Sequence, residues 1–299
     1  MNFPGIFTKA KLVLFCHILN PIWYSREKRR KIRTDYLVDT ADKYFQRYLP
    51  VVKGVEETKV INNDKKEKIF SIWLQGEENA PDLVKACFKS VRRHCKQELI
   101  VLNEQTLFDY IKLPEKIMEK RKQGLIKNAH FADICRVELL YQYGGIWLDA
   151  TGFVTEQIPQ YIIDSDFFMF LVRPMGTFGY SFVQNCFIRA RKGSYLLAAW
   201  RAMILDYWMH EDIELDYFMH QLLFRTLVTH DERGKKYFEQ MPHVFQDGTH
   251  SLWWEYKDKP FDEKVFRDVT KNAFFQKTTF KDFNNVIPGS FADVMLKME

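Results

Sequence analysis

Three charged side chains that could do chemistry lie in one short segment of the chain. Asp133 and Arg136 are three residues apart in an apolar run, so on a helix they share one face. Gly144 and Gly145 follow, and a short apolar segment then ends at Asp149. A charged pair on an apolar helix, close to a strand-end carboxylate, is costly to bury unless a ligand or a partner compensates it.

Spacing alone leaves a second interpretation open. Asp133 and Arg136 could form an intrahelical ion pair that contributes about 0.2–0.5 kcal/mol. In that case Asp149 would only cap the end of a strand.

The elements that would position these residues are indicated by hydrophobic periodicity. Residues 69–74 form a short apolar run ending at Gln75 and Gly76, which predicts a buried strand. After Asn79 as a possible cap, apolar residues repeat at helical spacing up to His94. Residues 98–102 predict a second strand, so the segment is typical of a βαβ unit in a parallel sheet with a right-handed crossover.

The charged segment itself predicts a helix followed by a strand. Asn128 can cap the helix, and Gly144 with Gly145 ends it. Residues 146–148 then form a very short strand with Asp149 at its carboxyl end, where ligands bind in open α/β sheets.

The second half of the chain predicts fewer regular elements. Residues 167–172 predict a further strand, and residues 195–208 and 216–228 predict aromatic-rich helices. The tail from Met241 mixes short strands and loops. Because neither an internal repeat nor a low-complexity linker divides the chain, we expect one continuous body.

Composition limits the class of protein. The 299 residues are 46% hydrophobic, which is enough for a globular core. Residues 26–33 carry a net charge of +5 from six basic residues and one acidic residue, and the whole chain also carries +5, so the remainder is balanced. This distribution argues against a general nucleic-acid binder. Five scattered cysteines without a Cys-x-x-Cys pair favour a reducing cytoplasm over disulfides or structural zinc.

The N-terminal region allows two interpretations. Residues 1–24 are apolar and aromatic and directly precede the basic cluster, an order typical of peripheral proteins on an anionic membrane. The same residues could instead form a helix packed on the body, followed by a solvated charged turn. The apolar run 12–19 is too short to span a bilayer, so we expect a soluble or peripheral protein.

At this point a family resemblance becomes visible. Ile72-Trp73 with Gly76, and the block from Ala132 to Asp149, resemble the capsular polysaccharide synthesis and glycosyltransferase family 32 pattern. The glycosyltransferase domains of large clostridial toxins are distantly similar. The resemblance covers about residues 66–290 and favours a ligand site over the simple ion pair. It implies a GT-A fold, an α/β Rossmann-like fold, in a catalytic domain over 66–299 with a helical insertion near 195–240. Residues 1–65 would form a basic, helical extension that could associate with a membrane.

The resemblance implies a UDP-sugar donor and a divalent cation, Mn²⁺ or Mg²⁺. Asp133 and Arg136 would contact the donor sugar and its diphosphate, and Asp149 would belong to a metal-binding Asp-x-Asp element. The segment around Trp73 would flank the nucleotide base. The donor-contacting residues expected in this way are Ile72, Trp73, Gly76, Ala132, Asp133, Arg136, Gly145, Ala150, Gln184, Asn185 and Lys277.

The sequence departs from the family pattern at the expected metal site. Thr151 stands where the second carboxylate would be, so the ligands Asp149 and Thr151 predict a weakened cation site. Gln276 stands where the family often has a histidine, while Lys277 could meet the diphosphate. A cation or an arginine would neutralise the charge that develops on the departing UDP.

A second pair of residues is expected to face the acceptor. Asp216 and His220 are four residues apart, so on one helix they share a face and could orient an acceptor hydroxyl. With Asp133, Arg136 and Asp149 they complete the predicted catalytic set. A hydrogen-bonded pair inside an aromatic helix is the alternative.

Relatives of this kind are retaining enzymes. No carboxylate nucleophile is marked in the sequence, so we expect the acceptor to attack from the face that the diphosphate leaves. The expected donor is UDP-galactose or UDP-glucose, with Ala150 placed to bias the choice between them. The expected acceptor is an undecaprenyl-diphosphate-linked saccharide at the inner face of the plasma membrane.

Two other functions stay open at this point. One is a toxin-like glycosyltransferase that modifies protein. The other is a catalytically inactive sugar- or lipid-binding module, suggested by the missing second carboxylate.

Overall fold

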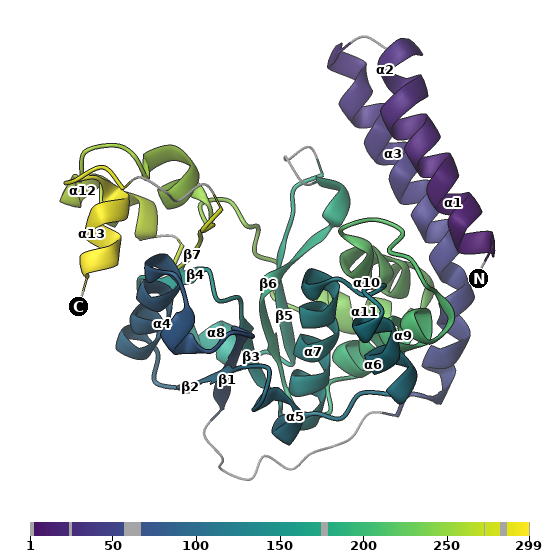
Figure 1. Cartoon of the computed structure of the whole chain (residues 1–299), viewed down its shortest axis with the longest axis horizontal. Helices are drawn as coiled ribbons and strands as arrows, with labels where there is room; N and C mark the ends of the chain where they lie inside the picture. Colours follow the sequence, from purple (N-terminus) through teal and green to yellow (C-terminus); the bar gives the residue numbers. More distant parts are fainter. Residues whose placement is uncertain are drawn as a thin grey trace.

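A five-stranded sheet lies at the centre of the mixed α/β fold (Figure 1). The computed structural model describes residues 3–23, 26–56, 67–174, 179–271, 273–281 and 286–298. The strand order is β2 (Glu98–Leu102), β1 (Lys68–Ile72), β3 (Gly145–Leu148), β6 (Val183–Ala190) and β5 (Phe167–Leu171). The first three strands are parallel, and β6 runs antiparallel to both β3 and β5. The GT-A assignment itself stays a prediction.

The predicted βαβ unit is confirmed. Helix α4 (Asp82–His94) connects β1 to the parallel strand β2, although Pro81 rather than Asn79 precedes its first turn. Strand β6 was not predicted, because Gln184, Asn185 and Arg189 interrupt any alternation of apolar and polar residues. Gln184 and Asn185 lie within this strand of the central sheet, next to β5.

Helix α7 (Asn128–Tyr143) and the turn after it set the position of β3. Gly144 and Gly145 adopt φ angles of 68° and 98°, which favour glycine. A Cβ atom on Gly145 would lie 2.4 Å from the backbone oxygen of Lys68 in β1. The turn therefore needs glycine at 145 for β3 to pair closely with β1.

The other helices surround this sheet. They are α5 (Leu107–Tyr110), α6 (Glu115–Lys122), α8 (Gln160–Ile163), α9 (Tyr195–His210), α10 (Met219–His230) and α11 (Glu232–Gln240), with the short 3-10 helices η3 (Glu77–Asn79) and η4 (Gly179–Ser181). Helix α10 begins three residues later than predicted, which places Asp216 before the helix.

The C-terminal tail is more helical than predicted. It contains a π-helical turn η5 (Leu252–Tyr256), α12 (Glu263–Thr270) and α13 (Phe291–Lys297). Strand β7 (Phe275–Lys277) belongs to this tail and pairs antiparallel with β4 (Gly152–Val154). Strand β4 follows β3 closely in the sequence.

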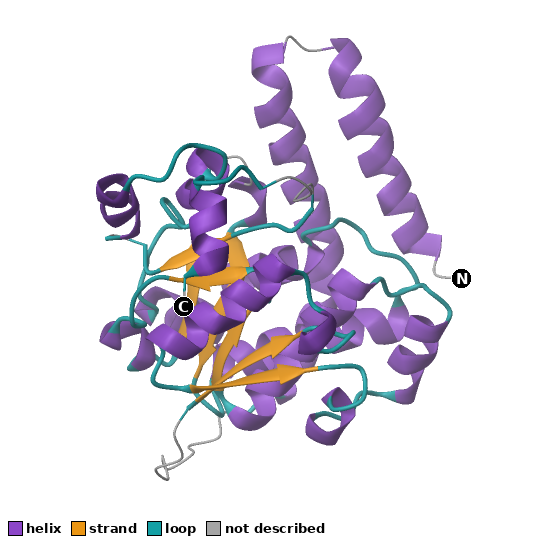
Figure 2. Cartoon of the chain, turned by 60° about the vertical axis from the view of Figure 1, so that its left-hand side comes forward, coloured by secondary structure: helices purple, strands orange, loops and turns teal. Residues whose placement is uncertain are grey.

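Two long helical segments at the N-terminus form a hairpin that projects from the body (Figures 1 and 2). One arm joins α1 (Phe3–Val13), the π-helical η1 (Leu14–Leu19) and α2 (Asn20–Trp23), and the other is α3 (Arg26–Phe45), followed by η2 (Gln46–Gly54). Leu37, Ala41 and Phe45 are buried in the same core as α9 and α10. Part of the predicted extension therefore belongs to the main core. The predicted boundary near residue 65 lies outside the described residues.

The first arm is longer and more apolar than the short run 12–19 suggested. Its segment Pro4–Ile22 has 19 residues and a mean hydropathy of 1.2, so by length and composition alone it could cross a membrane. Length therefore does not decide the matter, and the expected soluble or peripheral state of the protein stays a prediction.

The turn before β3 yields a stability prediction. Replacing Gly145 with alanine is expected to lower the free energy of unfolding by about 2 kcal/mol or more, because the new Cβ meets β1 and the positive φ angle is strained. Urea unfolding followed by circular dichroism measures the change.

Gly124→Ala is the matched control, because Gly124 also has a positive φ angle of 74° but has open space around it. It is expected to lose only about 1 kcal/mol. Equal losses in the two variants would show that the contact with β1 contributes nothing.

Candidate functional site

A cavity of about 460 Å³ opens at the carboxyl ends of β1 and β3. The predicted site residues that line it are Ile72, Trp73, Ala132, Asp133, Arg136, Asp149, Ala150, Thr151, Gln184, Asn185 and Lys277. The fold thus brings helix α7, the end of β3 and the distant strand β7 to one place.

Arg136 joins the charged groups of this cavity. Its guanidinium lies 3.0 Å from Asp133 Oδ1 and 3.3 Å from Asp149 Oδ1, and it donates a hydrogen bond of 2.6 Å to the carbonyl oxygen of Asn185. It also lies 4.9 Å above the Trp147 ring, whose Nε1 donates to Asp149 Oδ1 at 2.9 Å. The predicted Asp133–Arg136 ion pair exists, but it is part of a larger network.

Lys277 approaches Asp149 from the other side. Pairing of β4 with β7 sets Lys277 opposite Gly152, and its Nζ lies 3.1 Å from Asp149 Oδ2. The same ammonium donates a hydrogen bond to Thr151 Oγ1. Burial alone would raise the pKa of Asp149, but Lys277 and Arg136 outweigh it and hold that pKa below its ordinary value. Burial likewise lowers the pKa of Lys277, and Asp149 more than reverses this, so the pair is ionised.

The predicted cation ligands do not fit a divalent ion in this arrangement. Asp149 and Thr151 both accept hydrogen bonds from Lys277, whose positive charge lies where an ion between them would bind. The hard oxygen ligands that Mn²⁺ and Mg²⁺ prefer are thus already engaged by an ammonium group.

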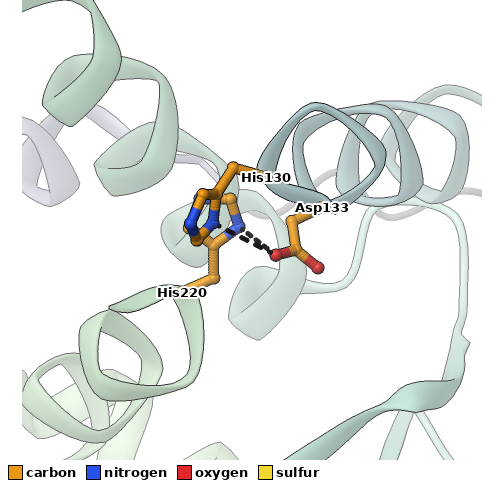
Figure 3. Close-up of side chains that lie close together, drawn as sticks. All are labelled: His130, Asp133 and His220. Carbon is orange, nitrogen blue, oxygen red and sulfur yellow. Dashed lines mark ion pairs between the residues drawn. The ribbon is translucent and has the colours of Figure 1, made fainter. Parts of the chain in front are cut away.

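A second polar cluster supports Asp133 from behind (Figure 3). Asp133 Oδ2 lies 3.2 Å from His220 Nδ1 and 3.7 Å from His130 Nδ1, and the three residues could each offer one metal ligand within 4.8 Å of the others. The opposite edge of His220 accepts a 3.1 Å hydrogen bond from Trp208 Nε1.

The hydrogen-bond pattern argues against a metal in this cluster. Because His220 Nε2 must be unprotonated to accept from Trp208, the proton of the neutral ring is on Nδ1, which cannot then bind a metal. Burial lowers the pKa of His220 despite the nearby carboxylate, which keeps this ring neutral. Burial would raise the pKa of Asp133, but Arg136 and His220 hold it far below its ordinary value. The histidines therefore orient an ionised Asp133.

The structure corrects three predicted site residues. Asp216 lies before α10, and its carboxylate accepts a 2.8 Å hydrogen bond from the Phe218 amide, so it does not pair with His220. Instead, His220 contacts Asp133. Gly76 and Gly145 are not among the residues lining the cavity, and both have positive φ angles that shape turns.

Several residues of the cavity were not predicted. Tyr217 and Trp254 line it and are 63% and 64% exposed, and His250 lines it beside Lys277. Burial, and then the nearby Lys277, lower the pKa of His250 to about 4. Their positions depend on long-range packing, so their sequence spacing carried no signal.

The neutral state of His220 predicts a dependence of stability on pH. The unfolded chain binds a proton at this residue more readily, so the free energy of unfolding is expected to fall as the pH drops below about 6.5. The contribution of one such group is at most about 1.4 kcal/mol per pH unit. His220→Gln is expected to remove this contribution. Urea unfolding between pH 7 and 5 measures how steeply the free energy of unfolding changes with pH.

His17→Gln is the control, because His17 is exposed on the N-terminal arm. It is expected to keep the wild-type slope. A His220→Gln protein that is less stable but has an unchanged slope would contradict a neutral His220.

Comparison with known proteins identifies the family of the chain. The family described as "Capsular polysaccharide synthesis protein" matches residues 20–295. O-glycosyltransferase PaGT of Phomopsis amygdali is 30% identical over 105 residues, which cover 32% of this chain and 25% of the relative, so the chain spans about a quarter of that protein. None of the solved structures gives a significant match. Because the family match extends over most of the sequence, this chain belongs to the capsular polysaccharide synthesis protein family.

Proposed function

We propose that this protein is a retaining glycosyltransferase of capsule synthesis. It transfers galactose or glucose from a UDP-sugar to an undecaprenyl-diphosphate-linked saccharide. Family membership and the glycosyltransferase relative support the reaction class. The observation that carries the proposal is the convergence of Arg136 and Lys277 on Asp149 at the wall of one cavity.

The charges of this cavity suit a nucleoside diphosphate. Its lining contains Arg136, Lys277 and Lys281 against Asp133 and Asp149, which is three positive and two negative charges, or a net charge of +1. Oriented cations in a half-buried site stabilise phosphate oxygens more strongly than they would in water. We place the diphosphate of the donor between Arg136 and Lys277.

Aromatic side chains offer surfaces for the base and the sugars. Trp73 packs edge-on against Phe280, with 5.4 Å between ring centroids, and both line the cavity. The exposed rings of Tyr217 and Trp254 line it as well. We place the uracil at Trp73, as the resemblance implies, and the acceptor saccharide against Tyr217 and Trp254. Ala150 lies beside Asp149 in this wall, where its small side chain leaves room to distinguish galactose from glucose.

The two acids of the cavity favour attack on the face from which UDP leaves. Asp133 and Asp149 are both paired with cations, so neither offers the free carboxylate that a covalent intermediate requires. In the proposed step the bond between C1 of the sugar and the β-phosphate oxygen breaks, and its electron pair stays on that oxygen. The acceptor oxygen bonds to C1, and its proton passes to the departing phosphate.

The activity is tested with radiolabelled UDP-galactose and UDP-glucose and membranes that contain lipid-linked saccharide. We expect label in the organic-solvent extract, and a loss of about 100-fold or more in Arg136→Gln, because this variant removes a charge that stabilises the departing diphosphate.

Arg201→Gln is the matched control, since Arg201 of α9 pairs with Glu138 of α7, the helix that carries Arg136, but does not line the cavity. It is expected to retain activity. Label in protein would identify a protein-modifying enzyme instead, and the absence of both transfer and donor hydrolysis would leave the sugar- or lipid-binding module.

We also propose that the protein works at the cytoplasmic face of the plasma membrane, held there by residues 1–33. Phe7, Leu14, Ile18 and Ile22 repeat at helical spacing along the first arm and are exposed, with Ile22 at 71%. On the second arm Lys28, Arg30 and Lys31 are exposed. An apolar face beside exposed cations is suited to an anionic bilayer surface.

A polar contact favours a helix lying along the membrane surface over one that spans it. Lys9 Nζ donates a 2.7 Å hydrogen bond to the carbonyl oxygen of Glu214 in the body, and Leu12 and Cys16 are buried against the protein. The arm is thereby fixed to the body along one face, and its opposite face is left for lipid.

Vesicle co-sedimentation tests this proposal. The protein is expected to bind vesicles containing phosphatidylglycerol and to bind pure phosphatidylcholine about tenfold or more weakly, because the basic residues meet anionic lipid. The double variant Leu14→Gln/Ile18→Gln is expected to lose binding by a similar factor, since it removes apolar area.

Tyr161→Gln is the control, because Tyr161 is 50% exposed on α8, away from the hairpin. Equal binding of all three proteins would exclude the apolar face as the membrane contact.

A further inference from the structure

We infer that the ammonium group of Lys277 takes the place of the divalent cation, so that the donor diphosphate is bound and neutralised without a metal ion. The inference rests on the proposed function and specifies how the same site handles charge. It departs from the Mn²⁺ or Mg²⁺ ion that the family resemblance implies.

The first argument is the number of acceptor positions left on Asp149. Its Oδ1 already accepts from Trp147 Nε1 at 2.9 Å and lies 3.3 Å from the Arg136 guanidinium. Its Oδ2 accepts from Lys277 Nζ at 3.1 Å. Both oxygens therefore have cationic or N–H partners, and an approaching metal ion would have to displace them.

The second argument is how firmly Lys277 is placed. The amide of Lys277 donates to the carbonyl oxygen of Thr249 at 2.6 Å, and the amide of Thr278 donates to the carbonyl oxygen of Thr151 at 2.8 Å. These bonds attach β7 both to Thr249 and to the residues that follow β3. Lys277 is thus carried on paired backbone and is not a flexible surface lysine.

The third argument is the capacity that remains on the ammonium group. It has three N–H donors, of which Asp149 and Thr151 take two. The Lys277 side chain is 24% exposed and lines the cavity, so one donor is available to a phosphate oxygen. Thr151 matters here because a hydroxyl accepts from the lysine without adding the second negative charge that a divalent ion needs.

The charge balance of the transfer step is complete without a metal. When the C1–oxygen bond breaks, the β-phosphate gains negative charge, which Lys277 and Arg136 offset. The proton that this phosphate receives comes from the acceptor hydroxyl. Lys277 keeps its own proton and is unchanged at the end of the reaction.

Binding of UDP, measured by calorimetry, tests the inference separately from activity. The wild-type protein is expected to bind UDP in EDTA with a dissociation constant within about twofold of the value in Mn²⁺. Lys277→Met keeps the aliphatic side chain but loses the charge, and it is expected to weaken UDP binding about tenfold or more in EDTA.

Two further variants separate charge from structure. Lys277→Arg retains a cation and is expected to recover most of the UDP affinity. Lys271→Met, at an exposed lysine just after α12, is expected to bind UDP as the wild type does. Circular dichroism of each variant identifies any loss of fold.

A gain of metal dependence provides the strongest test. Lys277→Asp places a second carboxylate near Asp149, so UDP binding is expected to become dependent on Mn²⁺, with free Mn²⁺ depleted in its paramagnetic resonance signal. If this variant does not fold, the Lys277→Met and Lys277→Arg measurements still decide the question.

The outcomes distinguish this inference from the proposed function. Wild-type binding of UDP only with Mn²⁺, or unchanged UDP binding by Lys277→Met, would overturn the role of Lys277 and leave the glycosyltransferase proposal intact. Failure of the wild type to bind UDP under either condition would overturn both.

Discussion

The site depends on two cations that compensate the negative charge of one half-buried carboxylate, Asp149. Asp149 follows a strand whose residues are entirely buried, and its charge is balanced by Arg136 from helix α7 and Lys277 from strand β7. An unpaired charge in such a position would cost several kcal/mol, commonly about 3–5 when one partner of a buried pair is removed. The same charge network therefore also ties helix α7 and the end of β3 to the distant strand β7.

Support for this network extends away from the cavity. Asn185 donates to Asp133 at 2.7 Å, and its carbonyl oxygen accepts from Arg136, so strand β6 fixes both members of the helical pair. Behind Asp133, His220 is itself held by Trp208. Because Asp133, Arg136 and Asp149 each have partners that fix their orientation, these charges are organised before a ligand arrives. This is the condition under which fixed charges stabilise a transition state best.

The sequence predicted what depends on local pattern. Apolar runs and glycine pairs were enough for the βαβ unit, for α7 and for Asp149 at a strand end, because these features arise from neighbouring residues. Pairing of Gly152 with Lys277 joins positions that are 125 residues apart through two strands of three residues, which are too short for a periodic signal. The prediction that Asp216 pairs with His220 was wrong for a related reason. The spacing assumed one continuous helix, whereas α10 begins only at Met219.

The charges around Asp149 explain why threonine can stand at position 151, where the family pattern has a second carboxylate. An Asp-x-Asp element with a divalent ion combines two negative and two positive charges. Asp149 and Thr151 with Lys277 combine one of each, so both arrangements are locally neutral before the donor binds. In both arrangements a positive centre lies beside the carboxyl end of β3, where we place the diphosphate of the proposed donor. Under the role that we infer for Lys277, loss of the second carboxylate is not a sign of an inactive site, because a lysine in place of the ion removes the need for that charge. An aspartate in place of Thr151 would instead leave an uncompensated negative charge facing the diphosphate of the proposed donor, and threonine at this position avoids that repulsion.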